Sequence, residues 1–212
     1  MTESLRDATP KGPATERPAL RSLVLAGGAS TRMGTDKALL SFGQGPQVRH
    51  VASLLDRLCP PVFVAVKREQ LGHPAFGGLR VLPDVDQGIG PLEGLLSAFR
   101  EAPKCAWLAV AVDMPFLTEA TLRHLIDKRD SGAFATAYRN PETDMPEPVC
   151  AIYEPRILPV LRRAKEKRLY SLMLLRDVPI RLIEPVRIGE LVNINNPDEY
   201  RGAGGINFPP AL

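Results

Sequence analysis

A glycine-rich segment with two basic residues follows the first apolar run and has the composition of a phosphate-binding loop. It reads Leu25-Ala26-Gly27-Gly28-Ala29-Ser30-Thr31-Arg32-Met33-Gly34-Thr35-Asp36-Lys37. Glycines let the backbone approach a ligand closely and point N–H groups at it. Arg32 adds a planar fork of donors and Lys37 a mobile point charge, and both suit phosphate oxygens. The adjacent Gly27 and Gly28 fit neither the P-loop nor the G-x-G-x-x-G pattern, and a glycine-rich turn with solvated charges is the alternative.

A carboxylate stands directly after the most apolar run of the chain. Asp113 follows Ala106–Val112 and precedes Met114-Pro115. A carboxylate just past the end of a buried strand is well placed to receive Mg²⁺, which prefers oxygen ligands. Such an ion neutralises charge that develops on a phosphorus under attack. The alternative is that Asp113 caps the next helix, but Thr118 stands nearer to the start of that helix and is the better cap. We therefore predict Asp113 as a ligand of a Mg²⁺ cofactor.

A third segment places glycines immediately before a helix. It reads Asp84-Val85-Asp86-Gln87-Gly88-Ile89-Gly90-Pro91-Leu92-Glu93-Gly94-Leu95. Proline suits the first turn of a helix, so we expect the helix to begin near Pro91. The free N–H groups of that turn, entered through Gly90, form a site for an anion or a base.

Alternating strand and helix patterns must position these segments. Short apolar runs rich in β-forming residues occur at Ser22–Ala26, Val62–Val66, Leu79–Leu82, Ala106–Val112, Ala133–Ala137 and Val149–Tyr153. Amphipathic spacing between them predicts helices at Gln47–Leu58, Leu92–Arg100 and Glu119–Lys128. This alternation predicts an α/β fold, a Rossmann-like, mostly parallel sheet with helices on both faces. The run before Asp113 does not alternate, as expected of a central strand that is buried on both sides.

The pattern is less regular after Tyr138. Prolines and acids predict a loop at 140–148, and helices are expected at Pro155–Lys167 and Ser171–Arg176, with a strand at Ile180–Ile183. A last short helix is expected at Pro197–Arg201 with Asn196 as its cap. We predict a disordered leader at 1–19, one domain at 20–201 and an irregular tail at 202–212.

Composition excludes several classes of protein. The formal net charge is only +3, and the chain is 44% apolar with three cysteines, none in a C-x-x-C pair. We therefore predict no nucleic-acid partner, no disulfide framework and no structural zinc, and mostly buried free thiols. The longest apolar run is too short to cross a bilayer and the first residues lack a secretory core, so we expect no membrane association and a cytoplasmic location. The basic run Arg162–Arg168 is interpreted as a solvated helix face.

The glycine-rich segment resembles a known signature, L-A-G-G-x-S-x-R-M-G-x-D-K. It belongs to the MobA-like nucleotidyltransferase family, which includes the molybdenum cofactor guanylyltransferases and has the nucleotide-diphospho-sugar transferase type of fold. The resemblance implies that Leu25, Ala26, Gly27 and the adjacent Gly28 hold the nucleotide, and that Lys37 contacts its phosphates. The family also carries the Asp-x-Pro of Asp113, with the aspartate as a Mg²⁺ ligand.

Three further segments extend the resemblance to about residues 21–201. The segment Gly90-Pro91-Leu92-Glu93-Gly94 is similar to the family's Gly-Pro-Leu-x-Gly, which an aspartate that contacts nucleotide precedes; Asp84 is the better-placed counterpart and Asp86 the other candidate. Glu147–Tyr153 resembles the family's strand near the acceptor, and Asn193–Tyr200 resembles its closing Asn-x-Asn-x-Pro-x-Glu motif, which lies near the active site. The sequence departs from the family after the second strand, where Lys67-Arg68 stands in place of an asparagine that contacts the base.

The resemblance implies transfer of GMP from GTP to the phosphate of molybdopterin, with release of pyrophosphate. No protein nucleophile is needed, and Arg32, Lys37 and Asp113 are the predicted catalytic residues. Transient contact with molybdoenzyme-maturation proteins is a further expectation. The alternatives are a cytidylyl- or sugar-phosphate nucleotidyltransferase of the same fold, and a catalytically silent nucleotide-binding or cofactor-delivery protein.

These assignments predict the effect of two substitutions. Lys37→Ala should lose about 1.5–3 kcal/mol of charge-assisted bonding, or roughly ten- to a hundredfold in turnover efficiency. Asp113→Ala should cost more, because it weakens the hold on the metal. Pyrophosphate release at matched Mg²⁺ measures both effects, and wild-type activity in both variants would contradict the site assignment.

Overall fold

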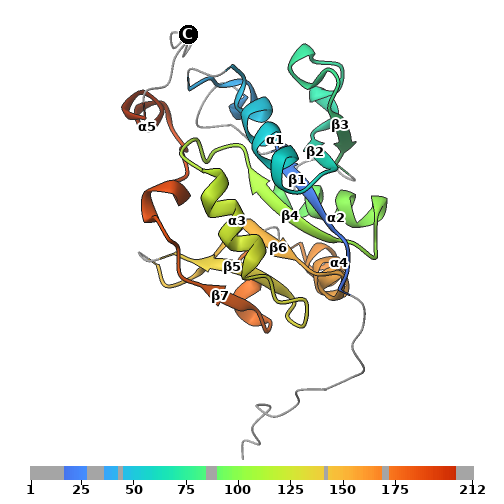
Figure 1. The fold of residues 1–212 in the computed structure, drawn as a ribbon. Coiled ribbons are helices and arrows are strands. Elements are labelled where there is room, and N and C mark those ends of the chain that lie inside the picture. The colour runs from blue at the N-terminus through green and yellow to red at the C-terminus, as the bar shows by residue number, and fades with distance from the viewer. Residues whose placement is uncertain are drawn as a thin grey trace, which may run out of the picture.

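A single sheet passes through the middle of the molecule (Figure 1). The computed structural model describes residues 17–27, 36–42, 45–84, 90–140, 143–168 and 172–203. Within these residues the sheet has seven strands in the order β3-β2-β1-β4-β6-β5-β7. The strands are β1 (Leu20–Leu25), β2 (Val62–Val66), β3 (Arg80–Pro83), β4 (Ala106–Ala111), β5 (Ala135–Arg139), β6 (Pro146–Tyr153) and β7 (Arg181–Ile183).

The sheet is mostly parallel, as the sequence predicted. Strand β1 is parallel to β2 and β4, and β2 is parallel to β3. Strand β6 is antiparallel to both β4 and β5, whereas β5 and β7 are parallel. The register pairs Leu25 with Ala65 on one side and with Ala111 on the other. The segments that follow β1, β2, β3 and β4 therefore leave the sheet at one edge.

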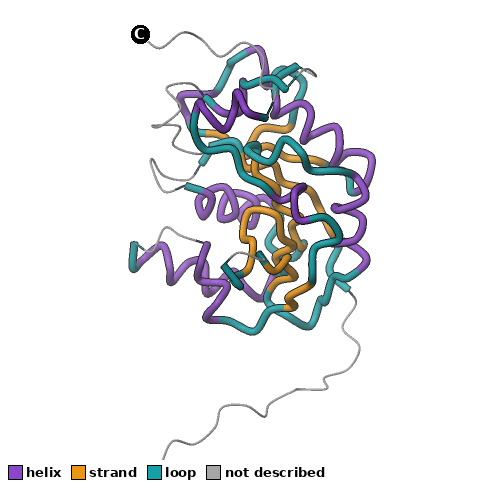
Figure 2. The backbone as a smooth tube through the Cα atoms, turned by 90° about the vertical axis from the view of Figure 1, so that its left-hand side faces the viewer, coloured by secondary structure: helices purple, strands orange, loops and turns teal. Residues whose placement is uncertain are grey.

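Helices cover both faces of this sheet (Figures 1 and 2). One face packs against α1 (Gln47–Leu58) and α3 (Glu119–Asp127), and the other against α2 (Pro91–Glu101) and α4 (Leu158–Glu166). Successive β1 residues alternate between the two cores, with Val24 in the first and Leu23 in the second. Every residue of β4 is buried, which confirms the prediction of a central strand with two covered faces.

Capping side chains and a first-turn proline set the starts of several helices, as the sequence indicated. Helix α1 has the predicted bounds, and α2 begins at Pro91, after Gly90 at φ +66°. Thr118 caps α3 by accepting from the Thr121 N–H, so Asp113 is not needed as a cap. The Asn196 side chain caps α5 (Pro197–Gly202) by accepting from the Glu199 N–H, as predicted.

The structure differs from the sequence prediction mainly after Asp130. Strand β5 starts two residues later than predicted, because Asp130 closes a turn by accepting from the Gly132 N–H. Strand β6 starts at Pro146 inside the predicted loop, since the Asn140 N–H donates to Met145 O and extends the hairpin.

The two later helices are also different from the prediction. The helix predicted at Pro155–Lys167 divides into a 3₁₀ turn, Pro155–Ile157, followed by α4, because Pro159 suits a new first turn. The segment predicted as a helix at Ser171–Arg176 forms a 3₁₀ helix at Leu172–Asp177, and Ser171 lies outside the described residues. Further 3₁₀ turns occur at Lys37–Leu39, Arg68–Gln70, Pro74–Phe76 and Ile188–Leu191.

A buried ion pair ties the start of the described chain to the domain. Arg129 donates to both carboxylate oxygens of Glu154, at 2.6 and 3.0 Å, and also to Pro18 O at 2.8 Å. Residues 17–19, which the sequence analysis assigned to the leader, thus bond to the domain, whereas residues 1–16 and 204–212 lie outside the described residues. Cys59 and Cys150 are buried and Cys105 is partly buried, all as free thiols. No described helix is long and apolar enough to cross a membrane.

We predict that Glu154→Ala destabilises the fold by about 3–5 kcal/mol, because it leaves the buried Arg129 guanidinium without its counter-ion. The side chains of this pair are only 4% and 1% exposed. The free energy of unfolding in urea measures the loss. Arg123→Ala, which breaks an exposed ion pair with Glu119, is the matched control and should leave the midpoint nearly unchanged. Equal midpoints for the two variants would contradict a stabilising role for Arg129–Glu154.

Candidate functional site

A cleft opens at the edge of the sheet where β1, β3 and β4 end. Eight of its lining residues are ones that the sequence selected: Leu25, Ala26, Gly27, Lys37, Asp84, Gly90, Pro91 and Asp113. Five others complete the lining: Ala65, Gly94, Ala111, Val112 and Val149. The structure thus brings three segments that are distant in sequence into one site. Gly28, Arg32 and Asp86 lie outside the described residues.

An ion pair between Lys37 and Asp113 joins two sides of the cleft. Lys37 Nζ lies 3.1 Å from Asp113 Oδ2 and 2.9 Å from Asn195 Oδ1. The Asp36 side chain accepts from the Ala38 N–H and so starts the 3₁₀ turn that carries Lys37. Both charged side chains are largely buried, with 17% and 20% exposure, so each charge depends on the other for compensation.

The second oxygen of Asp113 marks where a cation could bind. Asp113 Oδ1 is buried and accepts no hydrogen bond. Asp113 and Asn195 already direct oxygens at one cation, the Lys37 ammonium. Within the described part of the chain no cluster of three or more His, Cys, Asp or Glu could hold a metal. The oxygens of Asp113 and Asn195 nevertheless fit Mg²⁺, which commonly takes one or two protein carboxylates together with substrate phosphates.

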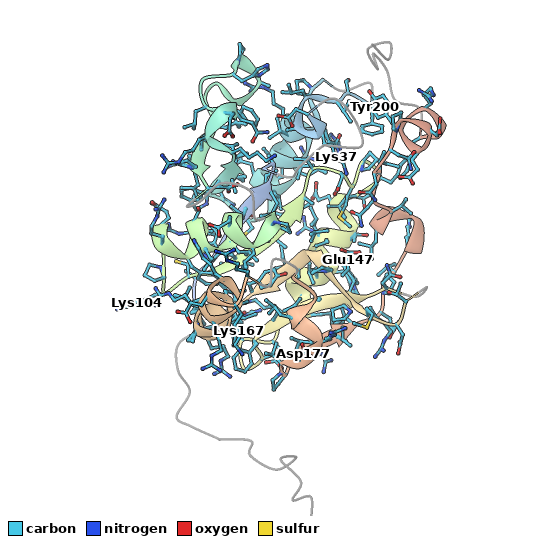
Figure 3. The ribbon with its side chains drawn as sticks, turned by 180° about the vertical axis from the view of Figure 1, so that it is seen from behind. Lys37, Lys104, Glu147, Lys167, Asp177 and Tyr200 are labelled. Atoms are coloured by element: carbon cyan, nitrogen blue, oxygen red, sulfur yellow. The ribbon has the colours of Figure 1, made fainter. Side chains whose placement is uncertain are left out.

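The C-terminal segment supplies Asn195 and is fastened along the site. The Ile194 N–H donates to Asp113 O at 2.8 Å. Glu190 accepts hydrogen bonds from the hydroxyls of Thr118 and Thr121, and the Tyr200 hydroxyl donates to Ser41 O at 2.6 Å. In Figure 3, Lys37 and Tyr200 lie together at the top of the view, far from Lys104. The sequence placed Asn193–Tyr200 near the site but did not identify Glu190 as its anchor.

A glutamine missed by the sequence analysis holds the two ends of the glycine-rich segment. Gln70 Nε2 donates to Ala26 O at 3.1 Å and to Asp36 Oδ2 at 2.5 Å. Its side-chain oxygen accepts from the Lys67 N–H at 2.7 Å. The Gln70 amide therefore holds Ala26, the residue after β1, close to Asp36, the residue before the 3₁₀ turn that carries Lys37. No sequence signal marked Gln70, because it lies in a short turn outside any of the matched motifs.

A buried carboxylate stands on the opposite wall of the cleft. Asp84 is 7% exposed, and its Oδ1 accepts no hydrogen bond. Burial, and then repulsion from Glu93, raise the pKa of Asp84 to about 7, while Lys67 opposes this shift. A Cβ at Gly27 would lie only 2.7 Å from Asp84 Oδ2, so glycine is required for this close approach. The pocket thus offers a carboxylate whose charge changes near neutral pH.

A second buried acid lies beside Asp113. Glu147, at the start of β6, is 5% exposed, and burial is the main cause that raises its pKa, with Asp113 adding repulsion. Asn193 and Asn140 donate to its carboxylate. Asn193 Oδ1 is itself buried without a hydrogen bond. Glu147, from the segment that the resemblance puts near the acceptor, and Asn193, from the closing motif, therefore both lie close to Asp113.

Comparison with known proteins places the chain in a family. Residues 22–180 match the family model described as MobA-like NTP transferase domain. A molybdenum cofactor biosynthesis bifunctional protein of Synechocystis sp. is 31% identical over 85% of this chain, which spans about half (52%) of that protein. A probable molybdenum cofactor guanylyltransferase of Bacillus subtilis is 30% identical over 84% of this chain and 92% of its own length.

The fold also resembles that of solved structures. Molybdopterin-guanine dinucleotide biosynthesis protein A from Archaeoglobus fulgidus superposes with a TM-score of 0.72 at 20% identity, covering 87% of this chain and 96% of that one. At this level of identity the likeness supports the fold alone.

The contact between Gly27 and Asp84 generates a testable prediction. Gly27→Ala should push the Asp84 carboxylate out of place and weaken nucleoside triphosphate binding about tenfold, or ~1.4 kcal/mol, as overpacking at a close contact does. Calorimetric titration measures this affinity. Gly189→Ala, where an added Cβ meets nothing within 4 Å, is the control and should bind as wild type does. Unchanged affinity in Gly27→Ala would show that nucleotide does not bind along this wall.

Proposed function

The chain belongs to the family of MobA-like NTP transferase domains, and on that premise we propose that it transfers GMP from GTP to the phosphate of molybdopterin and releases pyrophosphate. The single observation that carries the proposal is the meeting of Lys37 with Asp113, at 3.1 Å, on the same cleft as Asp84 and the first turn of α2. Relatives that carry the guanylyltransferase name support the choice of nucleotide and acceptor.

The triphosphate is proposed to lie between the two ends of the glycine-rich segment, with Ala26 and Gly27 at one end and Lys37 at the other. Ala26 and Gly27 stand at the carboxyl end of β1 and line the cleft, where a backbone with no side chain at Gly27 lets a phosphate approach closely. The Lys37 ammonium is held over the cleft by Asp113 and Asn195, so it meets phosphate oxygens without a large search of rotamers. Positioning of this kind, together with positive charge, is the main contribution that a protein makes to phosphoryl-type transfer.

Mg²⁺ is the proposed cofactor, with Asp113 as its carboxylate ligand and the Asn195 amide oxygen as a neighbouring donor. The buried, unbonded Asp113 Oδ1 supports this assignment. When bound, the ion would neutralise charge on the phosphate oxygens. Asp113 also has two roles that need no metal ion. Its carboxylate accepts from the Lys37 ammonium, and its backbone carbonyl accepts from the Ile194 N–H of the C-terminal segment.

Asp84 is proposed to read the base. Guanine presents two adjacent donors, the N1–H and the 2-amino group, and an ionised carboxylate accepts from both. Asp84 lies on the cleft wall that α2 also forms, with one oxygen buried and unbonded. A site built around such a carboxylate discriminates strongly against a base that lacks these donors, because the buried group is then left unpaired. Lys67 and Arg68, which stand where the family has an asparagine that contacts the base, are further candidates for a contact with the base.

The acceptor is proposed to approach from the side of Glu147 and Asn193. Asn193 Oδ1 is buried and unbonded, and so can accept from a donor on the acceptor molecule. Glu147 accepts a hydrogen bond from the Asn193 side chain, which leaves Asn193 Oδ1 as the atom that can accept from the acceptor molecule. The acceptor's phosphate would then attack the α-phosphorus of GTP in line, and pyrophosphate would leave toward Lys37. No protein nucleophile takes part.

A nucleotide panel tests the proposal. Mg²⁺-dependent pyrophosphate release with molybdopterin should occur with GTP and at most weakly with CTP, ATP or UTP. Nucleotide binding without turnover would instead indicate a cofactor-delivery protein, and a preference for CTP would indicate a cytidylyltransferase.

Asp84→Asn tests the reading of the base. The change should weaken GTP binding about thirtyfold, or ~2 kcal/mol, because it removes a charge-assisted acceptor. Binding of XTP should improve, since xanthine carries a carbonyl oxygen where guanine carries the 2-amino group. Equal losses for GTP and XTP in this variant would show that Asp84 acts on the fold and does not read the base.

A further inference from the structure

A buried ion pair lies behind the wall of the cleft that carries Asp84. Glu93, on α2, is wholly buried, and Lys165 Nζ from α4 lies 3.2 Å from each of its carboxylate oxygens. The Lys165 side chain is 26% exposed, so its charge is partly in contact with solvent. Helices α2 and α4 pack against each other on the same face of the sheet, and Figure 3 shows the end of α4 at Lys167 beside α2. The family's Gly-Pro-Leu-x-Gly motif leaves the position of Glu93 unspecified.

Glu93 lies in the first turn of α2, between two residues that line the cleft, but is not itself part of the lining. Pro91 and Gly94, on either side of it, line the cleft. One turn further on, Ser97 Oγ donates to Pro83 O at 3.0 Å, and Pro83 directly precedes Asp84. Residues four apart share a helix face, and helical side chains tilt toward the N-terminus. Glu93 is therefore directed toward the region of Asp84.

The charges around Asp84 come from three elements. Glu93 on α2 is the largest source of repulsion, Glu69 in the turn after β2 adds to it, and Lys67, directly after β2, opposes both. Burial and this repulsion hold the pKa of Asp84 at about 7. Lys165 supplies the counter-charge that a wholly buried Glu93 carboxylate needs.

We propose that Glu93, with Lys165 as its counter-ion, is a positioning residue that sets the charge of Asp84 and so makes recognition of guanine depend on pH near neutrality. The inference rests on the proposed reading of GTP by Asp84. An ionised Asp84 accepts from both donors of guanine, whereas a protonated one presents an O–H to them. A carboxyl group whose pKa is raised is ionised only above that value, so GTP binding strengthens as pH rises through about 7 and is lost below it.

Calorimetric titration of the full chain with GTP and Mg²⁺, at pH 6, 7 and 8, tests the inference without any acceptor. Wild-type affinity should be about tenfold weaker at pH 6 than at pH 8, because only about one-tenth of Asp84 is ionised at the lower pH. Glu93→Gln removes the repulsion. In this variant the affinity at pH 8 should exceed the affinity at pH 6 by less than about threefold, compared with about tenfold in wild type. GTP's own phosphates titrate identically with every variant, so the comparison between variants isolates the protein's contribution.

Two more variants make the result decisive. Glu101→Gln, an exposed change at the far end of the same helix, is the matched control and should keep the wild-type ratio. The double variant Glu93→Gln/Lys165→Gln replaces the ion pair by neutral amides, and should flatten the profile even if the single variant folds poorly. Identical pH profiles in wild type and the double variant would overturn the inference while the proposed function stands. Absence of GTP binding to the wild type at every pH would overturn the proposed function itself.

Discussion

The contact between Lys37 and Asp113 is the interaction on which the rest of the site depends. It joins the segment after β1 to the end of β4, two parts of the chain that are 76 residues apart in sequence. Both charges are largely removed from solvent, so neither side of the cleft keeps its arrangement without the other. Asn195 Oδ1, from the C-terminal segment, also accepts from the Lys37 ammonium, and the Ile194 N–H donates to Asp113 O and so fastens that segment to Asp113. The Lys37 ammonium therefore already links the segment after β1, the end of β4 and the C-terminal segment.

The sheet makes this meeting possible, and two glycines allow the close packing around it. Parallel β1, β2, β3 and β4 release their following segments at one edge, where ligands of open α/β sheets bind. Gly27 leaves space for Asp84, and Gly94 lets α2 approach β1, since a Cβ there would lie 2.8 Å from Leu25 Cδ2. The backbone thus forms one wall of the site, while charged side chains act from the other walls.

Motif and periodicity predicted the sheet, four main helices and eight of the cleft residues, because strand ends and glycine-rich turns leave local signals. The contribution of Gln70 was not predictable, since a glutamine in a short turn gains its role only from contacts that the fold creates. The same holds for Glu190, whose threonine partners lie 69 and 72 residues earlier in the chain. The start of β6 was missed because the prolines around Glu147 resemble a loop locally, whereas pairing of Pro146 with Arg139 on β5 extends the strand.

The central claim is that Lys37 and Asp113 face one triphosphate and its metal ion. The most direct measurement is a crystal structure with a non-hydrolysable GTP analogue and Mn²⁺, in which anomalous scattering locates the ion. The account predicts an anomalous peak at coordination distance from Asp113 Oδ1, with the Lys37 ammonium against the phosphate oxygens and the base beside Asp84. A peak remote from Asp113, or phosphates bound away from Lys37, would contradict it.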